Sequence, residues 1–353
     1  MISVPFGLPI VPMEAKVRTT WPVDGWAFEP KWDGFRAIAT GEERRLDSRK
    51  QKPLLRYFPE LAPMLAAIPE GTVLDGEILV VQHDRLAFDM LQTRIHPAQS
   101  RIDRLSTEMP ATFVAFDILA IDGEDLRSAP FWQRREHLES LTDRVPDAWR
   151  LTPSTTDVEV AKQWFNDFEA AGCDGIVAKA LQGPYVEGKR EMLKFKHRRS
   201  VDCVIGGYRV HKDGDKIGSL LLGLYTSEGE LAFIGHCSGF MKHDRVDLLA
   251  RFQDLRANDS FGDAVRRPGA ESRWSSGKDL SWVPVRPGVV IEISYDQLTG
   301  DRFRHATRFE RWRPDKDPTD CTFDQLERPQ GPGFSAISHQ APSASRQQIT
   351  DDR

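Results

Sequence analysis

The sequence predicts an α+β fold, in which a domain of mixed strands and helices precedes a smaller all-β domain. The chain has 353 residues, which is more than one hydrophobic core usually serves. Strand-like and helix-like segments alternate in the first part, whereas nearly every apolar segment after Val201 is strand-like. The end of the chain is poor in large apolar residues and rich in Pro, Gly, Ser and Gln. We therefore expect domains at 1–200 and 201–328 and a disordered tail at 329–353.

The first domain is predicted to contain mixed or antiparallel sheets with flanking helices. Runs rich in branched or aromatic residues and bounded by glycine or charge indicate strands at 26–30, 35–40, 72–81, 112–121 and 174–181. Helical patterns cover 54–68, 130–141 and 156–172. The last of these helices begins with a Thr/Asp cap and ends at Gly172. The charged motifs lie at strand ends and turns.

The second domain has the pattern of a small barrel. Its predicted strands are 202–210, 218–226, 230–238, 288–299 and 307–313, with one helix at 243–255. Roughly five strands and one helix fit a Greek-key barrel of the OB type, a fold suited to gripping nucleic acid. The polar insert at 256–282 is most simply a surface loop, and a DNA contact through its arginines is the alternative.

Composition excludes several classes of protein. The first residues lack the pattern of a secretory signal, and no segment is long and apolar enough to span a bilayer, so we expect a cytoplasmic protein without a membrane partner. The four cysteines are scattered, which predicts buried thiols rather than disulfides or a zinc site. The net charge of −5 argues against coating nucleic acid by bulk attraction. Locally, however, the runs GKREMLKFKHRR and DRFRHATRFERWRPDK are basic and carry interspersed aromatic residues.

The stretch FEPKWDGFR, residues 28–36, places Lys31 before an acidic turn. By itself K-x-D-G is weak, because a lysine there is usually a solvated surface charge. A protonated ammonium attacks nothing, so a nucleophilic lysine needs neighbours that favour its neutral form. Arginine would not replace it, since a guanidinium stays protonated.

Further motifs follow Lys31 in a fixed order, and together they resemble those of ATP-dependent DNA ligases of the covalent nucleotidyltransferase superfamily. The plan is closest to the short stand-alone bacterial type called ligase C. The motifs are KWDGFR, RLDSRK, LDGEIL, FVAFDIL, DGIVAK, LKFK and RFERWRPDK, and the resemblance runs from Pro12 to Thr322. It implies that an adenylation domain precedes the OB domain.

The resemblance implies a role for each matching residue. Lys31 would attack the α-phosphate of ATP, Glu29 would accept from the adenine amino group, and Arg36 would contact ribose or phosphate. Glu77 would meet the ribose hydroxyl or a metal, and Asp174, shorter than the glutamate of many relatives, would take the metal position. Asp33 would hold metal or the 3′ end. The remaining implied contacts are Phe116 and Val177 for the adenine faces, Ser48 and Arg49 for DNA at the nick, Lys194 and Lys196 for catalysis, and Arg311, Arg313, Asp315 and Lys316 for ATP.

Strand alternation puts Asp75 and Glu77 on one face, so that one serves the nucleotide while the other braces the turn. Oxygen ligands suggest Mg²⁺ or Mn²⁺. Lys194, Lys196 and this ion would penalise the charged form of Lys31. The expected cycle forms lysyl-AMP, transfers AMP to a 5′-phosphate, and seals the nick, with the barrel moving between steps.

The expected partners are nicked duplex DNA and unidentified repair proteins, and the expected enzyme is a monomer that associates with the nucleoid when engaged on DNA. Lys31 comes too early for an N-terminal DNA-encircling domain, which suggests simple nicks in repair. Rival interpretations are an RNA ligase, an mRNA capping guanylyltransferase, and a catalytically silent nucleic-acid-binding OB protein. Labelled ATP and GTP would separate the capping enzyme, and loss of the nucleophile or metal carboxylates would mark the silent protein.

Overall fold

The chain folds into two units, which we describe separately. Unit 1 contains the residues up to Lys196 together with those from Pro329 on, and unit 2 contains His197–Arg328. The computed structural model describes residues 2–41, 44–145, 147–240, 244–263, 267–269, 279–326 and 329–338.

The larger sheet of unit 1 is almost entirely antiparallel. Its strands pair in the order β4-β3-β5-β7-β8, with β6 on β5 and β9 parallel to β7. In this register Arg36 lies opposite Glu77, and Glu77 lies opposite Val114. The strands are β3 (Phe35–Thr40), β4 (Arg45–Ser48), β5 (Val73–Gln82), β6 (Arg85–Leu86), β7 (Ala111–Ile121), β8 (Glu124–Asp125) and β9 (Arg150–Leu151).

The smaller sheet of unit 1 is mixed, with the order β1-β11-β10-β2. Its strands are β1 (Ala15–Val17), β2 (Trp26–Pro30), β10 (Ile176–Ala180) and β11 (Met192–Phe195). The strands β1 and β11 are parallel, and the other pairs are antiparallel. Val177 lies opposite Glu29 on one side and Lys194 on the other. The register alone thus aligns three of the predicted site residues in one row.

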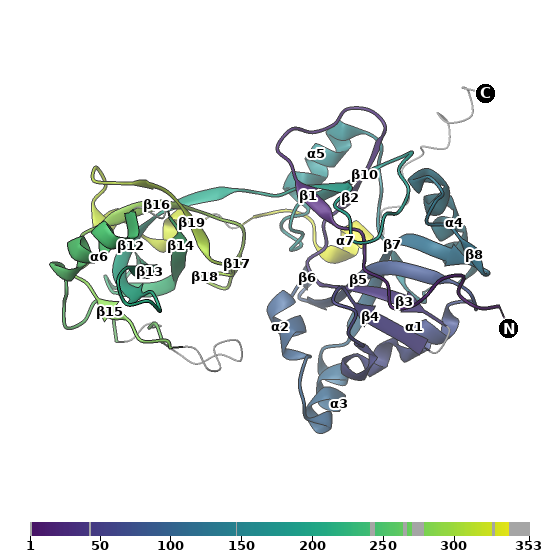
Figure 1. Ribbon diagram of the computed structural model, residues 1–353, viewed down its shortest axis with the longest axis horizontal. Helices are drawn as coiled ribbons and strands as arrows, with labels where there is room; N and C mark the ends of the chain where they lie inside the picture. Colours follow the sequence, from purple (N-terminus) through teal and green to yellow (C-terminus); the bar gives the residue numbers. More distant parts are fainter. Residues whose placement is uncertain are drawn as a thin grey trace. The chain divides into compact units, whose positions relative to one another are not determined.

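Helices cover these sheets (Figure 1), and one predicted helix is wrong. In place of a continuous helix at 54–68 the chain forms two short 3₁₀ turns and then α1 (Ala62–Ala67), because Pro59 and Pro63 each remove a backbone donor. The other helices are α2 (Phe88–Thr93), α3 (Gln99–Glu108), α4 (Phe131–Arg144) and α5 (Val158–Asp167). The predicted cap is confirmed, since Asp157 accepts from the amides of Glu159 and Val160.

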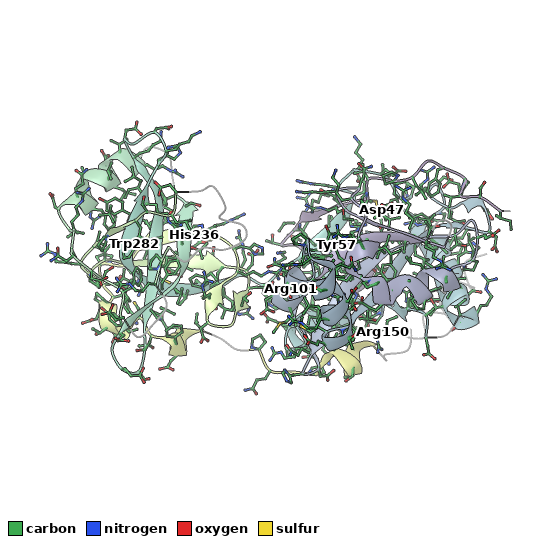
Figure 2. The ribbon with its side chains drawn as sticks, turned by 90° about the horizontal axis from the view of Figure 1, so that it is seen from below. Asp47, Tyr57, Arg101, Arg150, His236 and Trp282 are labelled. Atoms are coloured by element: carbon green, nitrogen blue, oxygen red, sulfur yellow. The ribbon has the colours of Figure 1, made fainter. Side chains whose placement is uncertain are left out.

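The segment after Pro329 was expected to be disordered, and this is wrong for its described residues. Helix α7 (Phe334–Ser338) packs on unit 1, where Figure 1 shows it in yellow among purple and blue elements. Phe334 and Ile337, one helical turn apart, are buried, and the Phe334 ring lies 5.7 Å from Trp32. The guanidinium of Arg150 lies 5.5 Å from the same ring, beside α7 in Figure 2. The amides of Phe334 and Ser335 donate to Asp84. Residues 339–353 lie outside the described part of the chain.

Unit 2 is a closed barrel, which fits the predicted OB-type fold. Strands β13, β14, β19, β16 and β12 pair in that order, and β12 pairs again with β13, which closes the sheet. The β14–β19 pair is parallel, and α6 lies between β14 and β16 in the chain, as in OB folds. The elements are β12 (Arg199–Val210), β13 (Ile217–Tyr225), β14 (Leu231–Gly239), α6 (Asp244–Gln253), β15 (Val283–Pro284), β16 (Val290–Tyr295), β17 (Leu298–Thr299), β18 (Arg302–Phe303) and β19 (Thr307–Trp312).

The insert at 256–282 is only partly described, and its described ends are anchored to the barrel. Phe261 is buried in the barrel core, and its ring packs 5.5 Å from that of Trp282, which Figure 2 labels. Residues 264–266 and 270–278 lie outside the described residues, so both the surface loop expected there and the alternative of a DNA contact stay predictions. All four cysteines are buried free thiols, as predicted. In the part of the chain that the structure describes, no helix has the length and apolarity needed to cross a membrane.

Candidate functional site

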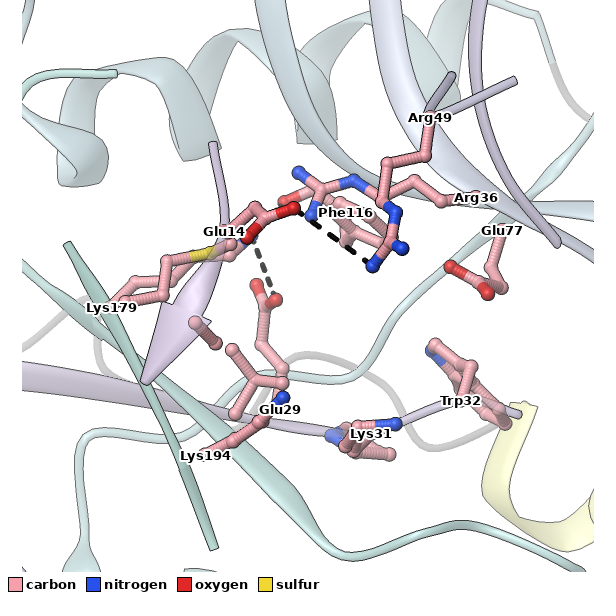
Figure 3. A pocket seen from close by; sticks show the side chains of 14 residues that line it. Glu14, Glu29, Lys31, Trp32, Arg36, Arg49, Glu77, Phe116, Lys179 and Lys194 are labelled. Carbon is pink, nitrogen blue, oxygen red and sulfur yellow. Dashed lines mark hydrogen bonds and ion pairs between the residues drawn. The ribbon is translucent and has the colours of Figure 1, made fainter. Parts of the chain in front are cut away.

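Residues from both sheets of unit 1 line one pocket of about 230 Å³ (Figure 3). Motifs that are far apart in the chain meet here because β2, β5 and β10 run past the same space. The predicted site residues that line it are Glu29, Lys31, Arg36, Arg49, Glu77, Phe116, Val177 and Lys194.

Backbone hydrogen bonds tie the Lys31 motif to the DGIVAK motif. The Lys31 amide donates to Gly175 O at 2.9 Å, and the Asp174 amide donates to Lys31 O at 2.8 Å. Gly175 has φ +119°, and a Cβ there would lie 1.9 Å from Phe195 O, so glycine is required. Lys31 and Asp174 are therefore fixed as neighbours by the fold itself.

The Asp174 carboxylate holds two ammonium groups. Lys31 Nζ lies 2.7 Å and Lys196 Nζ 2.8 Å from the same oxygen, Oδ2. Burial raises the pKa of Asp174, but these two cations outweigh it and keep that pKa below its ordinary value. For Lys194, burial together with the charges of Lys31 and Lys196 lowers the pKa. A protonated amine has no free lone pair, so Lys31 must give up a proton before it attacks an electrophile.

Arg36 is held rigidly beside the pocket. Its Nε and Nη2 donate to Asp75 at 2.9 and 2.5 Å, a bidentate pair. Tyr185 donates to the same carboxylate at 2.7 Å. The guanidinium also lies 5.1 Å from the centre of the Phe116 ring. Asp75 thus holds Arg36 in place, whereas which of Asp75 and Glu77 serves a nucleotide stays a prediction.

Glu77 is a carboxylate in an environment that disfavours its charge. Burial raises its pKa to about 8, against the opposing effect of Lys31 and Arg36 and with a further contribution from Asp33 and Asp75. Within the described residues no group of three or more His, Cys, Asp or Glu side chains converges as a metal site. Carboxylates beside a pocket lined by cationic side chains such as Lys31, Arg36 and Lys194 fit Mg²⁺ or Mn²⁺, which keep waters and bridge carboxylates to phosphates.

At another part of the pocket, Glu29 is buried, with 2% of its surface exposed. Lys179 Nζ lies 2.9 Å from Oε2, whereas Oε1 has no hydrogen-bond partner. A buried acceptor without a partner is costly, which marks Oε1 as a place for a ligand donor. The ring of Phe116 lines the same pocket and provides a flat apolar surface.

Lys179 is a lining residue that motif analysis missed. Alternation along β10 would have revealed it, because Lys179 lies two residues after Val177 and so shares its face. Glu14, Trp32 and Met192 also line the pocket without having been predicted.

The remaining predicted residues lie outside this pocket. The charge of Asp33 acts on Glu77 and Cys173, and Ser48 Oγ accepts from the Lys52 amide at 3.0 Å. Unit 2 carries the last motif. There Arg311 pairs with Glu292 at 2.6 Å, Arg313 pairs with Asp202 and Asp315 at 2.8 and 2.9 Å, and Lys316 lies 4.0 Å from Asp320.

Models of ATP-dependent DNA ligase domains match both units of the chain. The model of the ATP dependent DNA ligase domain matches residues 14–196, and that of the ATP dependent DNA ligase C terminal region matches residues 213–316. DNA ligase C2 of Mycolicibacterium smegmatis is 44% identical over 344 residues, which cover 93% of this chain and 97% of that protein. DNA ligase C of Mycobacterium tuberculosis is 46% identical over 346 residues, which cover 93% and 96%. A solved structure from work on Lig E DNA ligases has a TM-score of 0.58 at 16% identity, covers 86% of this chain and 100% of that one, and shares the fold.

Proposed function

Because the chain belongs to the ATP-dependent DNA ligases, we propose that it seals nicks in duplex DNA and that Lys31 carries AMP during the reaction. One observation supports this most strongly. Lys31 lies at a pocket that also contains an unpartnered buried acceptor, a flat aromatic ring and a fixed guanidinium. The acceptor suits the amino group of a base, the ring suits a face of the base, and the guanidinium suits a ribose or phosphate.

Adenine would bind at the Glu29 end of the pocket. The 6-amino group of the base would donate to Glu29 Oε1, and Phe116 and Val177 would cover its two faces. Arg36 would meet the ribose or a phosphate, because Asp75 already fixes the guanidinium in one orientation. Lys194 lines the phosphate-proximal side with Lys31, where its charge would attract the nucleotide.

Glu77 and Asp174 are the residues that would hold a divalent cation, Mg²⁺ or Mn²⁺, which supplies neutralisation of phosphate charge when bound. Their surroundings support this assignment. Glu77 lacks a short ion-pair partner among the described residues, and positive charge would restore its ionised form. Asp174 already binds cations, since two ammonium groups share its oxygen.

The cycle has three displacements at phosphorus. The Lys31 lone pair attacks the α-phosphorus of ATP, the bond to pyrophosphate breaks, and a phosphorus–nitrogen bond forms. A 5′-phosphate oxygen at the nick then displaces Lys31 and takes the AMP, and the adjacent 3′-hydroxyl finally displaces AMP and joins the strand. Lys196 would keep Asp174 neutralised when Lys31 departs, because both ammonium groups bind the same oxygen.

The other assignments concern DNA and the second unit. Ser48 and Arg49 would contact the phosphodiester beside the nick, and Asp33 would hold metal or the 3′ end. A nick sealer accepts any sequence, so its contacts should be to the backbone. Arg311, Arg313, Asp315 and Lys316 would orient pyrophosphate when unit 2 approaches the bound nucleotide.

We also propose a setting for the enzyme. It would act as a monomer in the cytoplasm, on the nucleoid, and would repair simple nicks together with unidentified repair proteins. Normal nick sealing accompanied by a severe replication defect after gene deletion would contradict the repair role.

The test is a nicked duplex incubated with ATP and Mg²⁺ or Mn²⁺, with adduct and joined product scored together. We expect wild type to give both, and Lys31→Ala and Lys31→Arg to fold but give neither. A joined product from the Lys31→Ala variant would refute the proposal. Labelled GTP should give no adduct, which separates the enzyme from a capping guanylyltransferase, and a nicked RNA duplex tests the RNA ligase alternative.

A further inference from the structure

Lys179 is a buried cation that contacts Glu29 and Phe116, two residues of the pocket lining. It donates to the Phe116 carbonyl oxygen at 2.6 Å. Its Nζ lies 2.9 Å from Glu29 Oε2 and 3.8 Å from Asp117 Oδ2. Its exposed fraction is 3%, so water contributes little to its solvation. The lysine is therefore held by groups that define the base-binding region.

Two other buried cations lie nearby, but neither forms a short ion pair with Glu29. Arg134 already binds Asp117, with Nε 2.8 Å from Oδ1. Arg135 Nη1 stays 3.6 Å from Glu29 Oε1, and neither atom has a hydrogen-bond partner. Among the described residues, Lys179 thus provides the short ion pair of Glu29.

The charge of Glu29 decides which base it can bind. An ionised carboxylate only accepts hydrogen bonds, whereas a protonated one also donates. A 6-amino purine presents a donor at this edge, and a 6-oxo purine presents an acceptor. Burial raises the pKa of Glu29 even though Lys179 and Arg135 act against it. Without its nearest cation, Glu29 would retain a proton to still higher pH.

We propose that Lys179 is a positioning residue that keeps Glu29 an ionised acceptor and thereby selects 6-amino over 6-oxo purine nucleotides. This inference rests on the proposed function, in which Glu29 faces the 6-amino group of the base. The neutral Glu29 of a variant without the cation would accommodate a 6-oxo group, which the ionised form repels.

The experiment measures lysyl-nucleotide formation from α-labelled ATP and ITP, whose base carries a 6-oxo group. Wild type should favour ATP. In Lys179→Met the ATP-to-ITP rate ratio should fall by about ten-fold or more, as expected for a lost hydrogen bond to a charged group. The matched control is Arg94→Met, which removes a buried cation paired with Glu60 at 2.6 Å outside the pocket lining, and it should keep the ratio.

A pH series on wild type tests the same inference without any substitution. The groups facing Glu29 are Lys179 from β10, Arg135 from α4 and Asp117 from β7. Asp117 stays ionised, because Arg134 and Lys179 outweigh its burial and lower its pKa. The ATP-to-ITP rate ratio of wild type should therefore decrease toward acid pH as Glu29 takes up a proton. In Lys179→Met the same decrease should begin at a higher pH than in wild type.

The outcomes separate this inference from the proposed function. An unchanged ratio in folded Lys179→Met overturns the role of Lys179. If that variant does not fold, a flat wild-type pH series overturns it, as does a Glu29→Gln variant with the wild-type ratio, since glutamine imitates the protonated acid. Absence of any adduct from ATP in wild type, or an adduct that survives Lys31→Ala, instead contradicts the proposed function.

Discussion

Replacing Glu77 by glutamine should stabilise the nucleotide-free protein at neutral and alkaline pH and impair its reaction with ATP. In the folded protein burial raises the pKa of Glu77 from 4.5 to about 8. Between these two values the unfolded chain has lost the proton while the folded one retains it. The unfolded state then binds fewer protons, so the free energy of unfolding decreases as pH rises through this window. Glutamine cannot ionise and escapes this loss.

The magnitude follows from the width of the window. The interval from 4.5 to about 8 is 3.5 pH units, and at ~1.36 kcal/mol per unit it corresponds to roughly 5 kcal/mol above pH 8. At pH 7 the interval is 7 − 4.5 = 2.5 units, or roughly 3 kcal/mol. Glu77 is only partly buried by surface area, and solvent screening reduces these values. We expect Glu77→Gln to gain about 2 kcal/mol at pH 7 and somewhat more at pH 8.5.

Urea unfolding at pH 5, 7 and 8.5 would measure this difference. The gain of Glu77→Gln should be near zero at pH 5 and grow with pH. The control Glu136→Gln changes an exposed carboxylate on α4 and should stay within about 0.5 kcal/mol of wild type throughout. The same Glu77→Gln sample should form lysyl-AMP more slowly, which is the pattern of a site that sacrifices stability for function. Equal unfolding free energies of wild type and Glu77→Gln at pH 8.5 would refute the reasoning.

Three further predictions concern packing, the base and DNA. Phe334→Ala should lower the free energy of unfolding by about 3 kcal/mol or more, because the ring is buried against Trp32. Trp fluorescence during urea unfolding would measure this change. An unchanged midpoint of unfolding would show that α7 does not stabilise unit 1. Phe116→Ala should weaken half-saturation by ATP roughly ten-fold or more in lysyl-AMP formation, because base stacking on an aromatic ring contributes about 1–3 kcal/mol, and Phe116→Trp should retain it. Binding of a nicked duplex by the Lys31→Ala variant should weaken steeply between about 50 and 200 mM salt, and a shallow dependence would argue against backbone contacts.

The motifs predicted many of the residues that line the pocket, but they predicted neither the strand pairing that brings these residues together nor the contact of Lys179 with Glu29. Glu29, Lys31 and Arg36 could be placed together from short spacing and resemblance, and the row from Glu29 to Lys194 follows once the strands pair. Strand order cannot be read from one sequence, so the pairing itself was beyond prediction. Lys179 was missed because a lysine near a strand end is usually solvated, and only its alternation with Val177 indicated otherwise.

Fold prediction succeeded where local pattern and tertiary structure agree. The strands at 26–30 and 35–40 have the predicted bounds, because apolar and aromatic residues in short runs are bounded there by glycine or charged residues. The helix at 54–68 was wrong because apolar periodicity outweighed Pro59 and Pro63 in the interpretation. The order around Phe334 was missed since a low average hydropathy conceals two apolar residues on a single helical turn.

The return of α7 to unit 1 means that the chain connects unit 2 to unit 1 at both of its ends. The chain leaves unit 1 after Lys196 and re-enters it at Pro329, so the barrel is an inserted segment with two covalent crossings rather than a terminal appendage. A body tethered at two points turns about the line between them, whereas one tethered at a single point tumbles in every direction. The contact of α7 with Trp32 therefore sets how firmly the second of these two crossings is anchored to unit 1.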